Sequence, residues 1–189
     1  ARNVDLVPAS INLLRVEQEP PTTVGLLRYL VTGIAPEYQI IFIDSPPQLA
    51  RLQAETLRAA THLLIPIGAT GLGLSALQLL ANMLRAIELT QTDAPRPLGR
   101  ILNLRKRRAH TERVIATMQN PKFDRLGPLF QTALNDRYEY AVAAIERKRA
   151  VIDAFPRSEA AAELRQLAQE FHTLLNAPKE EAEPEPVFK

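Results

Sequence analysis

The hydrophobic residues of this chain follow two patterns, short unbroken apolar runs and longer stretches in which apolar residues recur every three or four positions. Short unbroken runs predict strands that are buried on both faces, whereas the longer spacing predicts amphipathic helices. The predicted strands lie at residues 3–7, 39–43, 62–67, 99–104, within 126–132 and at 149–152. A short helix is predicted directly after Ser10. Further helices are predicted at residues 24–34, 49–60, 74–89, 111–119, 138–146 and 159–175.

The order of these elements predicts an α/β fold, because strands that alternate with helices form a mostly parallel sheet with helices on both faces. We expect residues 1–176 to form one such domain, since a chain of this length can bury a sizeable core. Residues 177–189 are rich in glutamate and proline. A segment of that composition cannot bury enough apolar surface to fold, so we expect a disordered acidic tail.

Composition narrows the classes of protein that the chain can belong to. No apolar stretch approaches the roughly 20 residues that span a bilayer, and the start shows no signal peptide. The chain has no cysteine, which excludes disulfides and iron–sulfur ligation and fits a reducing cytoplasm. The three histidines are far apart in sequence, which argues against a metal site or a catalytic triad.

Candidate chemistry begins at residues 38–47, Tyr-Gln-Ile-Ile-Phe-Ile-Asp-Ser-Pro-Pro. Asp44 follows the apolar run directly, and the carboxyl ends of strands are where open α/β sheets bind their ligands. The two prolines stop the strand, because proline has no N–H and a fixed φ. In a nucleotide-hydrolysing fold such a carboxylate orders Mg²⁺ and its waters. The alternative is a turn residue that caps the following segment.

This stretch resembles the Walker B segment of the ParA/MinD family of P-loop ATPases, in which a Tyr-Asp start and an apolar strand precede Asp-Thr-Pro-Pro. Gln39 and Ser45 are mild departures from that pattern. The resemblance extends, in order, to residues 3–10, 61–80, 98–104 with the basic loop after them, 132–137, 150–152 and 156–158. The order and spacing are those of chromosome and plasmid partition ATPases of the ParA/Soj type, which implies a P-loop NTPase-like fold.

One departure dominates the resemblance. The chain contains no Gly-x-x-x-x-Gly-Lys-Ser/Thr loop, in either the ordinary or the family's deviant form, and the switch I aspartate is missing. That loop and its lysine hold the phosphates of the nucleotide. The chain therefore looks like the carboxyl-terminal two-thirds of a ParA protein. We favour a truncated protein or gene fragment over a natural relative that lost catalysis, and we expect negligible ATPase activity from this chain alone.

The resemblance implies roles in binding ATP and Mg²⁺ for four residues. Asp44 would order the Mg²⁺ through water, and the amide of Asn103 would hydrogen-bond the adenine edge, to which it offers both a donor and an acceptor. Asn135 and Asp136 lie where the family has residues near the base. For Asn103 the alternative is a strand-end asparagine that satisfies loop backbone. Residues 71–73 hold two glycines but no lysine, so we interpret them as a flexible connection and not as a phosphate cradle.

Two clusters of basic residues imply the non-specific DNA surface of the family, because cations that neutralise phosphates bind DNA without reading bases. The alternative is a pair of solvated loops. The residues concerned are Arg105, Lys106, Arg107 and Arg108 in the first cluster, and Arg137, Arg147, Lys148 and Arg149 in the second.

The function implied is a cytoplasmic, nucleoid-associated partition ATPase that dimerises with ATP, binds DNA and responds to a ParB-type partner. A catalytically dead DNA- or partner-binding module of the same fold is one alternative. A MinD-like membrane-associated ATPase is another alternative. MinD-type proteins end in a basic amphipathic helix that lies in the membrane interface, whereas the tail here is acidic and broken by proline.

Overall fold

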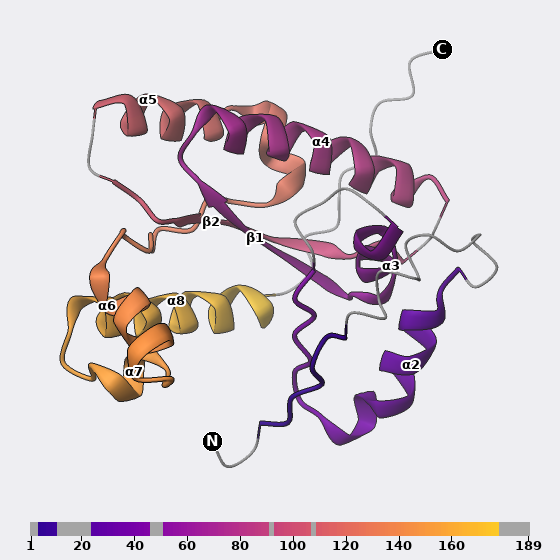
Figure 1. Ribbon diagram of the computed structural model, residues 1–189. Helices are drawn as coiled ribbons and strands as arrows, with labels where there is room; N and C mark the ends of the chain where they lie inside the picture. Colours follow the sequence, from indigo (N-terminus) through magenta and orange to yellow (C-terminus); the bar gives the residue numbers. More distant parts are fainter. Residues whose placement is uncertain (1–3, 11–23, 46–50, 91–92, 107–108, 178–189) are drawn as a thin grey trace. The chain divides into compact units, whose positions relative to one another are not determined.

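The computed structural model describes residues 4–10, 24–45, 51–90, 93–106 and 109–177. Within these residues the chain alternates helices and strands (Figure 1). The elements are α2 (Leu26–Ile34), the 3₁₀ helix η1 (Ala35–Glu37), α3 (Arg51–Ala59), β1 (His62–Gly68), α4 (Gly71–Glu88), β2 (Arg96–Asn103), α5 (Ala109–Met118), the 3₁₀ helix η2 (Pro121–Leu126), α6 (Tyr138–Ala141), the π-helical turn η3 (Val142–Glu146), α7 (Val151–Ala154) and α8 (Glu159–Leu175).

The chain divides into two compact units. Ala1–Leu63 and Ser75–Pro97 form the first unit, and Leu64–Leu74 and Leu98–Lys189 form the second. In the first unit, helix α2 begins after Gly25, whose positive φ of 87° suits a residue without a side chain. The N–H of Gly25 donates to the buried carboxylate of Glu55 in α3, at 2.9 Å. Glu55 thus caps α2 from the neighbouring helix, where the positive end of the helix dipole favours a negative charge.

The sheet confirms the predicted fold class. Strands β1 and β2 pair as a parallel sheet and are joined through α4. Isolated parallel bridges from Arg100 to Leu129 and from Arg105 to Asn135 add a third extended segment beside β2. Around β2 in the second unit, α5 and α8 lie on opposite sides of the strand in Figure 1. The architecture is therefore α/β, with a parallel sheet flanked by helices.

The centre of β2 is fixed by a buried arginine. Arg100 is only 3 % exposed, and its guanidinium donates to the carbonyl oxygens of Met118 at 2.5 Å and Gly127 at 2.9 Å. Burial lowers the pKa of Arg100, with Asp124 acting against that shift. Met118 ends α5, where a cation satisfies unpaired carbonyl groups and opposes the negative end of the dipole. Arg100 therefore attaches α5 and the chain after it to the strand.

The second unit closes with a small helical corner. Ala143, Val151 and Ala154 pack with two alanines in the first turn of α8, and Tyr140, Phe155 and Leu164 cover this cluster. Ser158 caps α8, because its hydroxyl oxygen accepts from the N–H of Ala161 at 3.1 Å. The predicted helix at 159–175 is confirmed in full. Among the described residues, no helix has the length and apolar character needed to cross a membrane.

Several predicted elements are wrong. The described residues 4–10 and 39–43 form no strand, and Phe42 is 73 % exposed. An apolar run becomes a buried strand only where neighbouring strands take up its N–H and C=O groups, and the described sheet consists of β1 and β2 without this run. Residues 151–154 form α7 instead of a strand. The predicted helix after Ser10 lies outside the described residues.

The predicted loop at residues 68–73 is also shorter than expected. Helix α4 begins at Gly71, and Thr70 caps it by accepting from the N–H of Gly73 at 3.1 Å. Glycine is required at position 73 because a Cβ there would lie 2.2 Å from the carbonyl oxygen of Gly68. The glycines therefore allow the helix to start directly against the end of β1, and they do not form a flexible connection.

Candidate functional site

Four of the predicted site residues meet where β2 ends. Residues 131–136 run beside the strand, and the N–H of Leu134 donates to the carbonyl of Leu102 at 2.8 Å. The backbone of Arg105 then donates to Leu134 at 2.9 Å and accepts from the N–H of Asp136 at 3.0 Å. These bonds bring Asn103, Arg105, Asn135 and Asp136 to one edge of the sheet, at the carboxyl ends of parallel strands, where α/β folds place ligands.

The side chain of Asn103 already has a backbone partner. Its Oδ1 accepts from the N–H of Leu104 at 2.9 Å, and Leu104 has a positive φ of 50°. This contact matches the alternative weighed for Asn103, a strand-end asparagine that satisfies loop backbone. The Nδ2 group still offers hydrogen-bond donors to a ligand, so the role of Asn103 at an adenine edge stays a prediction.

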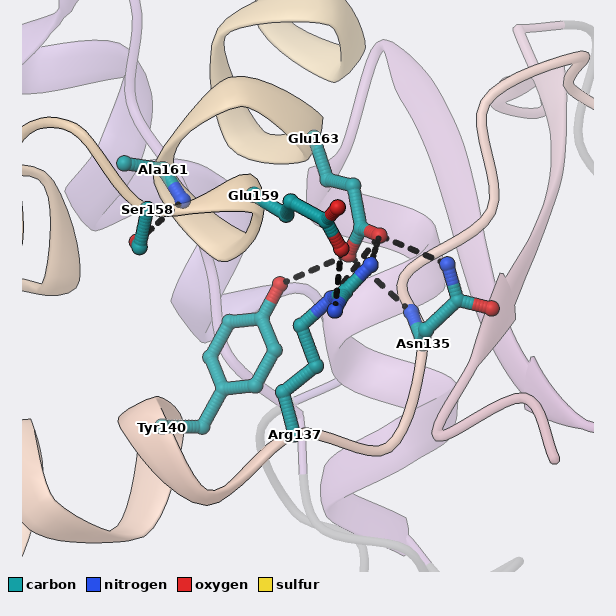
Figure 2. A network of polar contacts seen from close by, with 7 residues as sticks. All are labelled: Asn135, Arg137, Tyr140, Ser158, Glu159, Ala161 and Glu163. Atoms are coloured by element: carbon teal, nitrogen blue, oxygen red, sulfur yellow. Dashed lines mark hydrogen bonds and ion pairs between the residues drawn. The ribbon is translucent and has the colours of Figure 1, made fainter.

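A buried carboxylate organises the next part of the edge (Figure 2). Glu163 of α8 has a side chain only 12 % exposed. It accepts from the backbone N–H and Nδ2 of Asn135 at 3.2 and 2.6 Å, and from Nε and Nη2 of Arg137 at 3.0 and 2.8 Å. Tyr140 donates its hydroxyl more weakly, at 3.5 Å. Arg137 also pairs with the exposed Glu159 at 2.6 Å.

The ionisation of this network follows from its contacts. Burial on its own would raise the pKa of Glu163, but hydrogen bonds from Arg137 and Asn135 outweigh burial and lower it. Burial, with the negative charge of Glu163 beside it, raises the pKa of Tyr140 to about 12. The hydrogen bond to Glu163 raises the pKa of Arg137. At neutral pH the network is therefore an ion pair with a neutral tyrosine.

A second glutamate of α8 holds the same segment two turns further along the helix. Glu170 accepts from the backbone N–H groups of Gln131 and Thr132 at 2.7 and 3.0 Å. Beside this segment lies an open hollow of about 420 Å³, lined by Arg105, Gln131, Thr132, Ala133, Asn135, Glu163 and Gln166. Because glutamate already takes the backbone donors and adds negative charge, the hollow does not suit phosphate groups.

Asp44, the predicted Mg²⁺ residue, lies in the first unit, where it is exposed and outside any strand. In the part of the chain that the structure describes, no group of three His, Cys, Asp or Glu side chains is placed to hold a metal ion. With no lysine-containing glycine loop in the sequence, the described residues do not by themselves fit ATP with Mg²⁺. The part that Asp44 plays in ordering Mg²⁺ stays a prediction.

Three of the predicted DNA-binding cations are paired with acids. Arg105 bonds Glu112 at 2.7 Å, and Lys106 lies 3.2 Å from Asp136. Arg137 pairs with Glu159 and Glu163 of α8. A cation that has a carboxylate partner has less attraction left for a phosphate. Arg107 and Arg108, which complete the first basic cluster, lie outside the described residues.

The cations at residues 147–149, which we call the basic turn, are arranged differently. The N–H groups of Arg147 and Arg149 donate to Val142 and Ala143, both at 3.0 Å, which closes a tight turn between η3 and α7. Lys148 between them has a positive φ of 48°, a conformation that costs a side-chain-bearing residue about 1–2 kcal/mol.

All three side chains of the basic turn are exposed. The guanidinium of Arg147 donates to the carbonyl of Ala154 at 2.8 Å and lies 4.2 Å from the ring centroid of Phe155. Among the described carboxylates, none forms an ion pair with Lys148 or Arg149. The turn therefore presents adjacent positive charges on a backbone fixed at both ends.

Sequence reasoning missed the glutamates of α8 that hold the strand edge. Glu163 and Glu170 are seven residues apart, which places both on one face of the helix. That spacing is a usable signal, but acids at such spacing are common on solvated helix faces. The sequence does not reveal the role of Arg100, because an arginine within an apolar segment can mark the end of a strand as well as a buried side chain that caps a helix.

Comparison with known proteins finds similarity over about half of this chain. A family model described as "AAA domain" matches residues 1–95. A putative replication protein A of Rhizobium rhizogenes is 28 % identical over 101 residues, which cover 46 % of this chain and 25 % of that protein. The sporulation initiation inhibitor protein Soj of Bacillus subtilis (strain 168) is 30 % identical over 89 residues, which cover 46 % of this chain and 35 % of Soj. The matched parts thus span about a quarter to a third of these relatives.

Proposed function

Because this chain belongs to the ParA/Soj-like family of AAA domains, we propose that it is part of a DNA-partitioning ATPase and binds DNA without sequence preference through the basic turn. The observation that carries the proposal is the exposed charge of Lys148 and Arg149, which no described carboxylate pairs, on a turn fixed by backbone hydrogen bonds. Such cations neutralise phosphates and release counterions, which gives affinity without base contacts.

The salt dependence of DNA binding tests the role of the turn. Three phosphate contacts give a slope of log K against log salt of about −2.7, which weakens binding about 40-fold between 50 and 200 mM salt. The double variant Lys148→Asn with Arg149→Gln should reduce the slope by about 2. Asparagine at position 148 tolerates the left-handed backbone, so charge is removed without added strain.

The matched control removes two charges that are already paired. Arg105→Gln with Lys106→Gln should change the slope much less, because Glu112 and Asp136 already neutralise these cations. Fluorescence anisotropy with a duplex of arbitrary sequence measures the DNA affinity of wild type, the turn variant and the control at each salt concentration. An unchanged slope in the turn variant, or an equal loss in the control, would refute the assignment of DNA binding to the basic turn.

In a protein that also carries a phosphate-binding loop, we propose that nucleotide and Mg²⁺ bind with the help of Asp44, Asn103, Asn135 and Asp136. ATP would supply the energy for a cycle of dimerisation and release, stimulated by a ParB-type partner and taking place on the nucleoid. The family's general use of nucleotide supports this proposal. These 189 residues alone should have negligible ATPase activity, and ATP turnover that Asp44→Ala abolishes would contradict that expectation.

A second candidate is a DNA-binding module that works without nucleotide. The hydrogen bonds that shape the basic turn all come from the chain itself, so the surface forms without a bound nucleotide. Equal affinity for DNA with and without ATP and Mg²⁺ favours the module. Binding that appears only with both present favours the partition ATPase.

A further inference from the structure

An exposed aromatic ring lies next to the basic turn. Tyr138 opens α6, and its side chain is 70 % exposed. Its ring meets Phe155 edge to face, with centroids 6.4 Å apart and an interplanar angle of 69°. Phe155 in turn packs against the alanine-rich core of the helical corner. The Tyr138 ring is therefore anchored to a fixed neighbour while most of its surface stays open to solvent.

The same phenylalanine holds the basic turn. The guanidinium of Arg147 lies 4.2 Å from the Phe155 centroid, so Arg147 and Tyr138 both contact one phenyl ring. Lys148 and Arg149 follow Arg147 directly. The fold thus brings an open aromatic ring and the first of three consecutive cations to the same phenyl ring, although Tyr138 and the turn come from opposite ends of the α6–η3 segment.

Cations beside an aromatic ring match the chemistry of an unpaired nucleotide. Proteins that bind single strands combine positive charge along the backbone with aromatic side chains on which bases stack. In a duplex the bases stack on each other, so a protein ring cannot reach their faces unless a base leaves the stack. Tyrosine and arginine are also enriched at protein interfaces, whereas lysine is depleted there, so the three consecutive cations are what favour a nucleic acid on this surface.

We propose that the basic turn and Tyr138 form a site for single-stranded nucleic acid, in which the cations hold phosphates and one base stacks on the tyrosine ring. This inference rests on the proposed function, since it takes the basic turn as the phosphate-binding surface, and it adds unpaired nucleotides as a substrate class. Stacking tolerates every base, so the site has no sequence preference.

The test compares oligothymidylate with an abasic oligonucleotide of the same length and number of phosphates. The chain contains no tryptophan, so Tyr138→Trp provides a single fluorescent reporter at the site. Oligothymidylate should quench this fluorescence and the abasic strand should not. Tyr138→Ala should weaken binding of oligothymidylate about 10-fold and leave the abasic strand unchanged. Tyr29→Ala is the control, because Tyr29 is 77 % exposed in the other unit.

The outcomes separate this inference from the proposed function. Equal affinity of wild type for the two strands overturns stacking, while duplex binding through the turn would stand. Preference for oligothymidylate that depends on Tyr138, with no binding to duplex, supports the single-strand site and overturns the duplex proposal. An equal loss in Tyr29→Ala also overturns the inference, because it shows a general effect of removing a tyrosine.

Discussion

Two glutamates of α8 contact the same arginine but should differ greatly in their contribution to stability. Glu163 and Glu159 both pair with Arg137, one helical turn apart. The side chain of Glu163 is 12 % exposed and that of Glu159 is 79 % exposed. We expect Glu163→Ala to destabilise the protein strongly and Glu159→Ala to have little effect, since burial decides what an ion pair contributes.

The magnitude follows from the groups left without partners. Glu163 accepts hydrogen bonds from two groups of Asn135 and two of Arg137. Breaking a buried pair by removing one partner costs about 3–5 kcal/mol, and we take about 3 kcal/mol because Arg137 keeps Glu159. An exposed pair contributes about 0–1 kcal/mol. At about 2–4 °C per kcal/mol for a chain of this size, Tm should fall by about 6–12 °C for Glu163→Ala and by less than about 4 °C for Glu159→Ala.

Thermal and urea unfolding followed by circular dichroism measure both variants. The difference in the free energy of unfolding between wild type and Glu163→Gln should also become smaller at acidic pH. The partners of Glu163 lower its pKa in the folded state. Its contribution to stability is therefore present above the usual pKa range of glutamate and is lost as pH falls through the pKa of the folded state. Equal destabilisation by the two alanine variants, or a difference that persists in acid, would refute the assignment of this stability to the buried charge.

Three further substitutions test other contacts. Tyr140→Phe should remove the tyrosinate absorbance that appears near pH 12. Because this pKa is raised in the folded protein, the contribution of Tyr140 to the free energy of unfolding is complete below about pH 10 and is lost as pH rises towards 12. Gly99→Ala should cost more than about 2 kcal/mol in urea unfolding, since φ is 147° and the new Cβ would lie 2.5 Å from the Pro128 carbonyl. Glu55→Gln should cost about 1–2 kcal/mol in the same assay, because it removes the buried charge that accepts from Gly25, and Glu37→Gln, an exposed change, should cost almost nothing.

The sequence predicts α8 in full because the hydrogen bonds of a helix join residues that are close in the chain. A strand is also predicted at residues 99–104, and the structure has β2 at Arg96–Asn103 with Leu98, Ile101 and Leu102 buried. The run at 39–43 is more apolar but lies outside any strand and is partly exposed. Periodicity reports which residues favour burial, whereas a strand also needs a neighbour for its backbone groups. That neighbour is not encoded in the run itself.

The candidate site was predicted as a set of residues but not as a set of contacts. The run from Arg105 to Arg108 is the denser basic cluster in sequence, yet Arg105 and Lys106 are paired with Glu112 and Asp136. Asp136 lies thirty positions from Lys106 in the chain, so no local pattern could reveal the pair. The positive φ of Lys148 was equally hidden, because lysine carries no preference for that conformation.

Pairing, more than density of charge, therefore decides which cations of the second unit are available to a phosphate. The acids of α5, α8 and the strand edge neutralise Arg105, Lys106 and Arg137, and Glu163 also attaches α8 to the strand edge through Asn135. The described chain leaves Lys148 and Arg149 without such partners, on a turn whose backbone conformation is unfavourable for lysine. This combination of backbone strain and exposed charge on the described turn is the reason why we propose that the basic turn binds a polyanion.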